Sequence, residues 1–266
     1  MLTRSLILLG IPTRIIVDGD DIAEIASAAG DTDPNLKFRD GDILVIAESA
    51  LATAEGRIIR LSDINPSEEA YWYANKYHMD PSLAEVVLSE SDSIVGGIDG
   101  FLLCMKQGTL LPNAGADESN APKGHVVLLP EDPDKSACSI RTHIFNTCQV
   151  QVSVIIADSR THPMRYGCSA IAIGCSGMEA VCDERGRTDL FGRRLEVTRR
   201  AIADNVSSAA ELLMGEADES VPMVIVRGLN VRTGDFVGIE QISPDECLFM
   251  GTIARNRLDT TRRTPP

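Results

Sequence analysis

The chain has 266 residues, a formal net charge of −14 at pH 7 and a sequence pI near 4.7. This acidic balance argues against a nucleic-acid-binding protein, which carries a basic footprint, and against docking on anionic membranes. The length suffices to bury a substantial core, and the composition suits a cytoplasmic protein whose carboxylates bind hard cations.

In the first half of the chain, the apolar pattern predicts two strands and a helix. The short apolar run from Leu6 to Leu9 predicts a first strand; it is too short for a signal peptide and no cleavage site follows it. A turn at Gly41 leads into a buried strand over 43–46. The sequence Asp80-Pro81-Ser82 predicts the start of a helix that ends before Gly96.

In the second half, an apolar strand over 150–156 is expected to stop at Asp158. Apolar residues at helical spacing predict a helix over 202–213, with Gly215 as its C-terminal cap. Another strand follows over 221–226. Strands interleaved with helices indicate an α/β or α+β protein.

Seven cysteines are scattered along the chain without any C-x-x-C pair. Cys168, Cys175 and Cys182 are spaced seven residues apart, so they form either a trio of metal ligands or buried, reduced thiols. We favour reduced thiols in a reducing compartment, because the residues over 171–174 resemble packed structure.

Acidic segments mark three positions that can bind a cation. The loop over 113–120 offers oxygens from Asp117 and Asn120, although its composition also fits an ordinary Asx-rich turn. Asp158 and Ser159 lie where a strand is expected to end, which suits either a ligand or a helix N-cap.

The third acidic segment, over 214–218, contains Glu216 beside the expected helix end and also fits a solvated helix terminus. The spacing of the three segments does not establish that they meet. The chain lacks the phosphate loop G-x-x-x-x-G-K-[ST], G-x-G-x-x-G opening a helix, G-x-S-x-G and H-E-x-x-H. The commonest nucleotide-binding and hydrolase motifs are therefore excluded.

A set of short strings carries a family resemblance that runs in order from about residue 10 to about residue 250. The strings lie at 19–21 (Gly-Asp-Asp), 54–57 (Ala-Glu-Gly-Arg), 113–120, 128–134, 183–193 and 214–222. Together they resemble the coenzyme F-420-0:L-glutamate ligase family, the gamma-glutamyl ligases (CofE).

The resemblance implies a two-lobed α/β fold of mixed α+β character that is neither a P-loop nor a Rossmann fold. It implies one ligase domain over 1–250, built of two intertwined lobes and assembled as a homodimer. A polar C-terminal tail over 251–266 is expected to follow.

The implied reaction joins the carboxylate of a deazaflavin coenzyme precursor to the amine of L-glutamate. GTP is the co-substrate, Mg²⁺ or Mn²⁺ the implied cofactor with K⁺ as a further cation, and an acyl phosphate the intermediate. The implied partners are therefore a small-molecule acid and an L-glutamate-like amine. The alternatives are a paralogue that uses another acid, amine or ATP, and a catalytically silent relative that binds a metabolite or metal.

Carried over by the resemblance, the metal-binding positions are Asp117, Asp158, Ser159 and Glu216. Asp117 and Asp158 are also the expected catalytic residues. For the proton of the incoming amine, Asp117, a water molecule and the phosphate itself remain alternatives. Asn120 and the loop at Gly215 match nucleotide-contacting positions.

Two stretches depart from the family pattern. Where the family reads Thr-Gln-Lys-x-x-Ser-Lys, this chain has Glu48 for the glutamine, and Ser49 and Thr53 replace the two lysines expected near the triphosphate. We expect this rebuilt loop over 48–53 still to contact the nucleotide. After Asp158, the family reads Thr-Phe-Gly-Arg-Pro-Trp-Arg, and this chain has Ser-Arg-Thr-His-Pro-Met-Arg over 159–165. The family's Gln-Thr-Asp/Asn, which follows the next glycine, is Cys-Ser-Ala over 168–170. The candidates that compensate for the lost charges are Arg160, His162 and Lys106.

Overall fold

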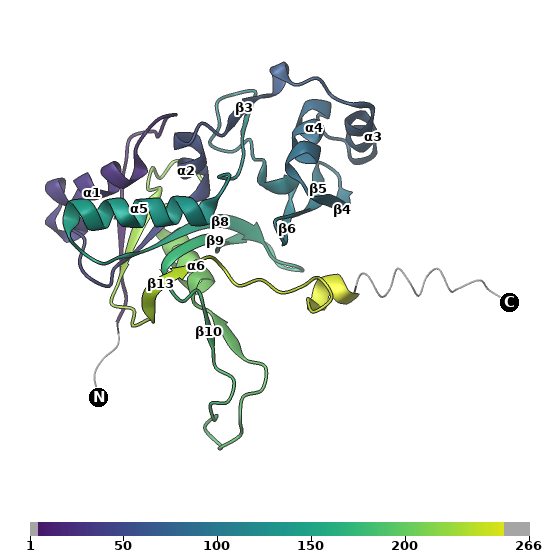
Figure 1. Cartoon of the computed structure of the whole chain (residues 1–266). Coiled ribbons are helices and arrows are strands. Elements are labelled where there is room, and N and C mark those ends of the chain that lie inside the picture. Colours follow the sequence, from purple (N-terminus) through teal and green to yellow (C-terminus); the bar gives the residue numbers. More distant parts are fainter. Residues whose placement is uncertain (1–4, 253–266) are drawn as a thin grey trace. The chain divides into compact units, whose positions relative to one another are not determined.

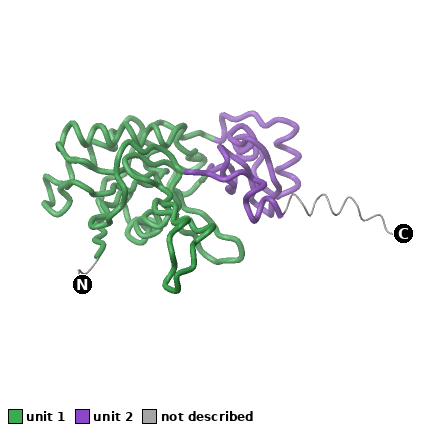
Figure 2. The backbone as a smooth tube through the Cα atoms, turned by 60° about the horizontal axis from the view of Figure 1, so that its bottom comes forward, with its two compact units in different colours: residues 1–60, 117–239 green, residues 61–116, 240–266 purple. Residues whose placement is uncertain are grey.

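The computed structural model describes residues 5–252. The tail predicted over 251–266 lies outside the described residues except for its first two. The chain folds into two compact units, with Met1–Arg60 and Asp117–Ile239 forming unit 1, and Leu61–Ala116 and Glu240–Pro266 forming unit 2 (Figure 2). In the described part of the chain, no helix has the length and apolar character that crossing a membrane requires.

A six-stranded mixed sheet forms the centre of unit 1. Every neighbouring pair in it is antiparallel except β2 and β8, which are parallel. Its strand order is β1 (Ile7–Ile11), β12 (Met223–Arg227), β2 (Ile43–Ala47), β8 (Ser153–Thr161), β9 (Cys168–Met178) and β13 (Thr233–Val237). The strands predicted near the N-terminus, at 43–46 and at 221–226 are confirmed, as is the mixed α/β fold class.

Helices cover both faces of this sheet (Figure 1). On one face, α1 (Ile22–Thr32) and α5 (Pro133–Cys148) pack against alternate residues of the central strands, including Leu44 and Ile156. On the other face, α6 (Ile202–Met214) packs against Val45 and Ile155. The helix predicted over 202–213 is confirmed, and Gly215 is its C-cap.

The parallel pair of strands brings two chain segments to the same edge of the sheet. Ala47 is the register partner of Ala157, so Glu48 and Asp158 are the residues that directly follow the parallel pairing of β2 with β8. Glu48 is also the first residue of α2 (Glu48–Ala54), which follows β2 without a loop. The segment over 48–53, expected as a loop, is therefore helical.

Strand β8 is longer than the apolar run predicted, because it continues through Asp158 to Thr161 and pairs there with the start of β9. The expectation that the strand stops at Asp158, and its alternative as a helix N-cap, are therefore wrong. Ile156 pairs with Gly174 and Ala157 with Ala172, which leaves Ile173 as an extra, bulged residue on β9.

Two short ribbons complete unit 1. Strands β3 (Ile58–Arg60) and β7 (His125–Val127) pair antiparallel, and Asp117 forms an isolated bridge with Val127 through two backbone hydrogen bonds of 3.0 and 2.8 Å. Strands β10 (Val181–Asp183) and β11 (Arg199–Ala201) form the second ribbon, which is separate from the six-stranded sheet.

Unit 2 combines two helices with a three-stranded antiparallel sheet. The helices α3 (Glu68–Tyr77) and α4 (Pro81–Glu90) pack through small residues, and the Asp80 side chain caps α4 as predicted. The buried Asn113 accepts a hydrogen bond of 2.8 Å from the backbone N–H of Leu102. The strands are β4 (Ser93–Ile98), β5 (Phe101–Lys106) and β6 (Thr109–Pro112).

Candidate functional site

Four carboxylates from separate segments of unit 1 lie close enough together to act on one another electrostatically. Burial raises the pKa of the Asp158 carboxyl, and the charges of Asp117 and Glu216 raise it further. Burial also raises the pKa of Glu48 well above its usual range, and the charge of Asp158 adds to this. Glu48, Asp117, Asp158 and Glu216 are called the acidic cluster below. The first and third acidic segments of the sequence thus lie within electrostatic range of Asp158 in the second.

Alternation along β8 decides which of its side chains enter this cluster. Asp158 and Arg160 are buried, whereas Ser159 and Thr161 are exposed. Successive side chains of a strand point to opposite faces, so Asp158 and Arg160 share a face that Ser159 does not. The Ser159 side chain therefore lies on the other face of β8 from Asp158, and its role as a metal ligand stays a prediction.

Arg160 forms an ion pair with Asp158 inside the protein. Its Nε donates a hydrogen bond to Asp158 Oδ2, and the exposed fractions of the two side chains are 7% and 11%. The guanidinium charge lowers the pKa of both Asp158 and Glu48, against the larger effect of burial. One positive charge therefore offsets part of the repulsion among four carboxylates.

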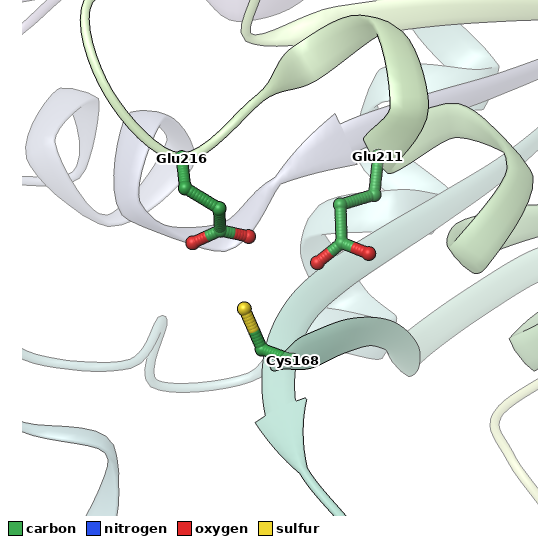
Figure 3. A group of neighbouring side chains, drawn as sticks. All are labelled: Cys168, Glu211 and Glu216. Carbon is green, nitrogen blue, oxygen red and sulfur yellow. The ribbon is translucent and has the colours of Figure 1, made fainter. Parts of the chain in front are cut away.

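Glu216 connects the acidic cluster to a second group of potential metal ligands. One ligand atom each of Cys168, Glu211 and Glu216 lies within 4.8 Å of the others, and the three side chains point toward one another (Figure 3). Cys168 begins β9, Glu211 lies in the last turn of α6 and Glu216 follows the helix. Burial and the charge of Glu216 raise the pKa of Cys168.

The loop that presents Glu216 depends on Gly215. This glycine adopts a φ of +69°, and its N–H bonds the Glu211 carbonyl at 2.9 Å. A Cβ at this position would lie 2.1 Å from the Glu219 carboxyl carbon, and the Glu219 carboxylate accepts a hydrogen bond from Ala217 N–H. The positive φ favours glycine at this position, and any other residue would also displace the Glu219 carboxylate.

The remaining predicted residues lie on local turns or on α2. Asp117 is exposed and accepts a hydrogen bond of 3.0 Å from Ser119 N–H, and Asn120 is an exposed residue with a φ of +53°. Ser49 and Thr53 are both half-buried, one helical turn apart on α2. Their roles as nucleotide contacts stay predictions.

Of the three cations proposed to compensate for the missing lysines, Arg160 lies in the acidic cluster. Lys106 Nζ pairs with Glu90 at 2.6 Å within unit 2, and its side chain is 11% exposed. His162 Nε2 lies 2.7 Å from Ser169 Oγ near the turn between β8 and β9. The sequence alone offered no reason to prefer Arg160, although its spacing of two from Asp158 on a strand is the signal that places both side chains on one face.

The cysteines are all free thiols, but the expectation of buried thiols at Cys168, Cys175 and Cys182 holds only for Cys175, because Cys168 is exposed and Cys182 is half-buried. The alternative trio of Cys168, Cys175 and Cys182 is wrong, because Cys175 is buried with its Sγ donating to the Met178 carbonyl, and the Sγ of Cys182 donates to Glu184. Sequence reasoning missed Glu211, because a carboxylate in the last helical turn is typical of a solvated helix end.

The donors of the acidic cluster suit a hard divalent cation. Mg²⁺ and Mn²⁺ bind carboxylate oxygens, and a bound cation neutralises the repulsion among neighbouring carboxylates. Asp117, Asp158 and Glu216 come from three segments and interact through space. The donor types of the acidic cluster therefore suit such an ion, whereas the ligand atoms that lie within 4.8 Å of one another in the described part of the chain are those of Cys168, Glu211 and Glu216.

Comparison with known proteins places this site in a family context. The model of the family F420-0:gamma-glutamyl ligase matches residues 10–228. A Methanopyrus kandleri protein named coenzyme F420:L-glutamate ligase is 42% identical over 226 residues, covering 85% of this chain and 87% of the relative.

Proteins of the same name from two further organisms are also similar to this chain. The Methanocaldococcus jannaschii protein is 45% identical over 79% of this chain and 84% of its own length. The Archaeoglobus fulgidus protein is 41% identical over 84% of this chain and 86% of its own length. With a family model spanning all four members of the acidic cluster and relatives matched over most of their length, this chain belongs to the F420-0:gamma-glutamyl ligase family.

Proposed function

We propose that this chain is a nucleotide- and metal-dependent ligase that joins the carboxylate of coenzyme F420-0 to the amine of L-glutamate. The observation that carries the proposal is the acidic cluster, in which the buried Asp158 directly follows the parallel pairing of β2 with β8 and lies within electrostatic range of Asp117 and Glu216. The family description and the relatives' names supply the acid and the amine.

In this proposal, Asp117, Asp158 and Glu216 hold Mg²⁺ or Mn²⁺. Ser159, which directly follows Asp158 and is exposed, stays the predicted fourth ligand. The bound metal supplies neutralisation of phosphate oxygens and alignment of the reacting oxygens. K⁺ is a further cation whose effect on the reaction rate is to be measured.

The proposed chemistry has two steps. An oxygen of the acid's carboxylate attacks the terminal phosphorus of GTP, the bond to GDP breaks, and an acyl phosphate forms. The glutamate nitrogen then attacks the acyl carbon, the carbon–oxygen bond to phosphate breaks, and the nitrogen loses a proton. Asp117 and Glu216 are the exposed carboxylates of the acidic cluster, and Asp117, a water molecule and the phosphate itself are the candidates that accept this proton.

Nucleotide contacts are proposed for two sides of the acidic cluster. Asn120 lies three residues after Asp117, and Gly215 directly precedes Glu216, so both adjoin metal-holding residues. On α2, Glu48 lies in the acidic cluster, and Ser49 and Thr53 offer hydroxyl groups where the family has lysines. Hydroxyls bind phosphate oxygens without charge, so we expect weaker nucleotide binding than with lysines.

A homodimer is part of the proposal. The loop between β10 and β11 carries Leu190, Phe191 and Val197, whose exposed fractions are 99%, 90% and 83%. Large apolar side chains gathered on a ribbon are typical of an interface. Light scattering after size-exclusion chromatography tests this: we expect the mass of two chains for the wild type, and a lower mass after substituting Phe191 by Ser.

The decisive experiment incubates the protein with coenzyme F420-0, L-glutamate, GTP and Mn²⁺. We expect GDP and phosphate release, and a mass increase of the coenzyme by one or more glutamyl residues. Glu216→Gln is expected to lower the rate at least tenfold, because it removes a metal-holding charge. Asp218→Asn, an exposed neighbour in the same loop, is the matched control and is expected to retain the rate.

Several outcomes separate the alternatives. Amide formation with ATP but not GTP would change the nucleotide and leave the ligase proposal intact. Phosphate release with another acid or amine only would identify a paralogue with different substrates. Tight Mn²⁺ binding without turnover of any nucleotide would contradict the ligase proposal and favour a silent metal-binding relative.

A further inference from the structure

Arg160 carries a hydrogen-bond donor that the protein itself does not use. Its side chain is 7% exposed, and its Nε is taken by Asp158. Its Nη1 is buried and has no hydrogen-bond partner among the residues that the structure describes. Leaving a buried, charged N–H unpaired destabilises a protein, so such a group calls for an acceptor that arrives from outside.

The chemistry of the guanidinium limits what that acceptor is. A guanidinium has five N–H donors, no acceptor, and keeps its charge at all accessible pH values. A ligand atom that meets Nη1 is therefore an acceptor, and an anionic oxygen is preferred beside a buried cation. The ion pair with Asp158 does not remove this preference, because Asp158 accepts from Nε and leaves Nη1 without an acceptor.

The position of Arg160 places this donor beside the reacting groups. Arg160 pairs with Asp158 and acts electrostatically on Glu48, so it lies inside the acidic cluster. An anion approaching carboxylates meets repulsion, which a bound metal and this one guanidinium oppose. Lys106, the other buried cation considered, is taken by Glu90.

We propose that Arg160 Nη1 binds an anionic oxygen of a substrate at the acidic cluster, with Nε holding Asp158 at the same time. This inference rests on the proposed function for the identity of the substrates. Two sources carry suitable oxygens, namely a phosphoryl group of the nucleotide and a carboxylate of L-glutamate. In both cases one side chain positions a metal-holding carboxylate and the substrate together.

Binding measurements on Arg160→Gln and Arg160→Lys test the proposal. Arg165→Gln is the matched control, because Arg165 is exposed and lies five residues further along the chain. Calorimetric titrations use Mn²⁺ alone, GTP with Mn²⁺, inorganic tripolyphosphate with Mn²⁺, and L-glutamate. Circular dichroism and a thermal melt establish that each variant is folded.

We expect Arg160→Gln to weaken GTP and tripolyphosphate binding about 10- to 100-fold, as loss of a charge-assisted hydrogen bond predicts. Mn²⁺ binding is expected to change less than anion binding, because Asp158 loses both its competing cation and its positioning hydrogen bond. If Arg160 had only a structural role, its loss would affect Mn²⁺ binding and anion binding alike. Arg160→Lys keeps the charge but lacks the forked N–H donors of the guanidinium, so an intermediate loss of anion affinity is expected. This variant takes the place of Arg160→Gln in the titrations if Arg160→Gln does not fold.

The arms of the titration identify the source of the oxygen. Loss of L-glutamate binding alone assigns Nη1 to the amine substrate's carboxylate, and loss of both phosphate ligands assigns it to the nucleotide. Unchanged affinity for all three anions in a folded Arg160 variant overturns the inference and leaves the proposed function standing. Tripolyphosphate binding that depends on Arg160, without amide formation from any substrate, would support the inference and overturn the proposed function.

Discussion

The buried ion pair between Asp42 and Arg227 ties the end of β12 to the turn before β2. The exposed fractions of these side chains are 1% and 13%. Arg227 Nε and Nη2 donate to the two Asp42 oxygens at 2.8 and 2.7 Å, and Arg39 N–H donates to Oδ2 at 2.8 Å. Arg227 Nη2 also reaches the Lys37 carbonyl at 2.9 Å.

Substituting Asp42 by Ala removes three charge-assisted hydrogen bonds and leaves the guanidinium largely buried. Breaking a buried pair by removing one partner typically costs about 3–5 kcal/mol, and we expect a loss of that size in the free energy of unfolding. Urea denaturation followed by circular dichroism measures it, with the denaturant slope expected to stay unchanged.

Two further variants make the reasoning refutable. Asp183→Ala removes the partner of Arg185 from an ion pair in which both side chains are 47% exposed, and its stability is expected to stay close to that of the wild type. Replacing both Asp42 and Arg227 by apolar residues is expected to regain much of the loss, because no buried charge is left unpaired. An Asp42→Ala protein as stable as the Asp183→Ala protein would refute the argument.

Three other perturbations have defined outcomes. Burial raises the pKa of Glu48, so the protonated side chain favours the folded state. This contribution to the free energy of unfolding is fully present below the ordinary glutamate pKa of about 4.3 and is lost as pH rises through the pKa of the folded state. Glu48→Gln should therefore raise the melting temperature at pH 8 more than at pH 4.5. Burial and the charge of Glu216 raise the pKa of Cys168, so iodoacetamide should modify this thiol slowly at pH 8 and faster in Glu216→Gln; equal rates in mass spectrometry would contradict this. A Cβ at Gly174 would lie 2.5 Å from backbone at the start of α5, so Gly174→Ala should lower unfolding stability by about 1–3 kcal/mol, whereas Gly96→Ala, with open space around it, should not show a steric penalty of this kind.

Local sequence patterns were sufficient for the strongly apolar elements. The apolar strand over 43–46 and the helix ending at Gly215 were predictable, because periodic burial and a capping glycine are local signals. The extension of β8 past Asp158 was not predictable, because the polar residues there are held in the strand by pairing with β9 and not by their own pattern. Strand pairing therefore overrode local polarity.

The same distinction applies to the candidate site. That Asp117, Asp158 and Glu216 are acidic is visible in the sequence, whereas their convergence depends on the parallel pairing of β2 with β8 and on where α6 ends. The unused donor of Arg160 is a property of packing, and no spacing rule predicts it. The segment over 48–53 was expected as a loop because sequence pattern does not separate a short helix from a turn.

The bulge at Ile173 limits how the length of β9 can vary during evolution or engineering. This extra residue separates the stretch of β9 that pairs with Val154–Ile156 from the stretch that pairs with Ala157–Thr161. Deleting Ile173 would restore regular pairing and shift Cys168–Ala172 by one residue relative to β8. Each of these side chains would then point to the opposite face of the sheet, and Cys168 would no longer lie beside Glu216. Insertions and deletions at this point are therefore expected to be selected against even where substitutions are tolerated.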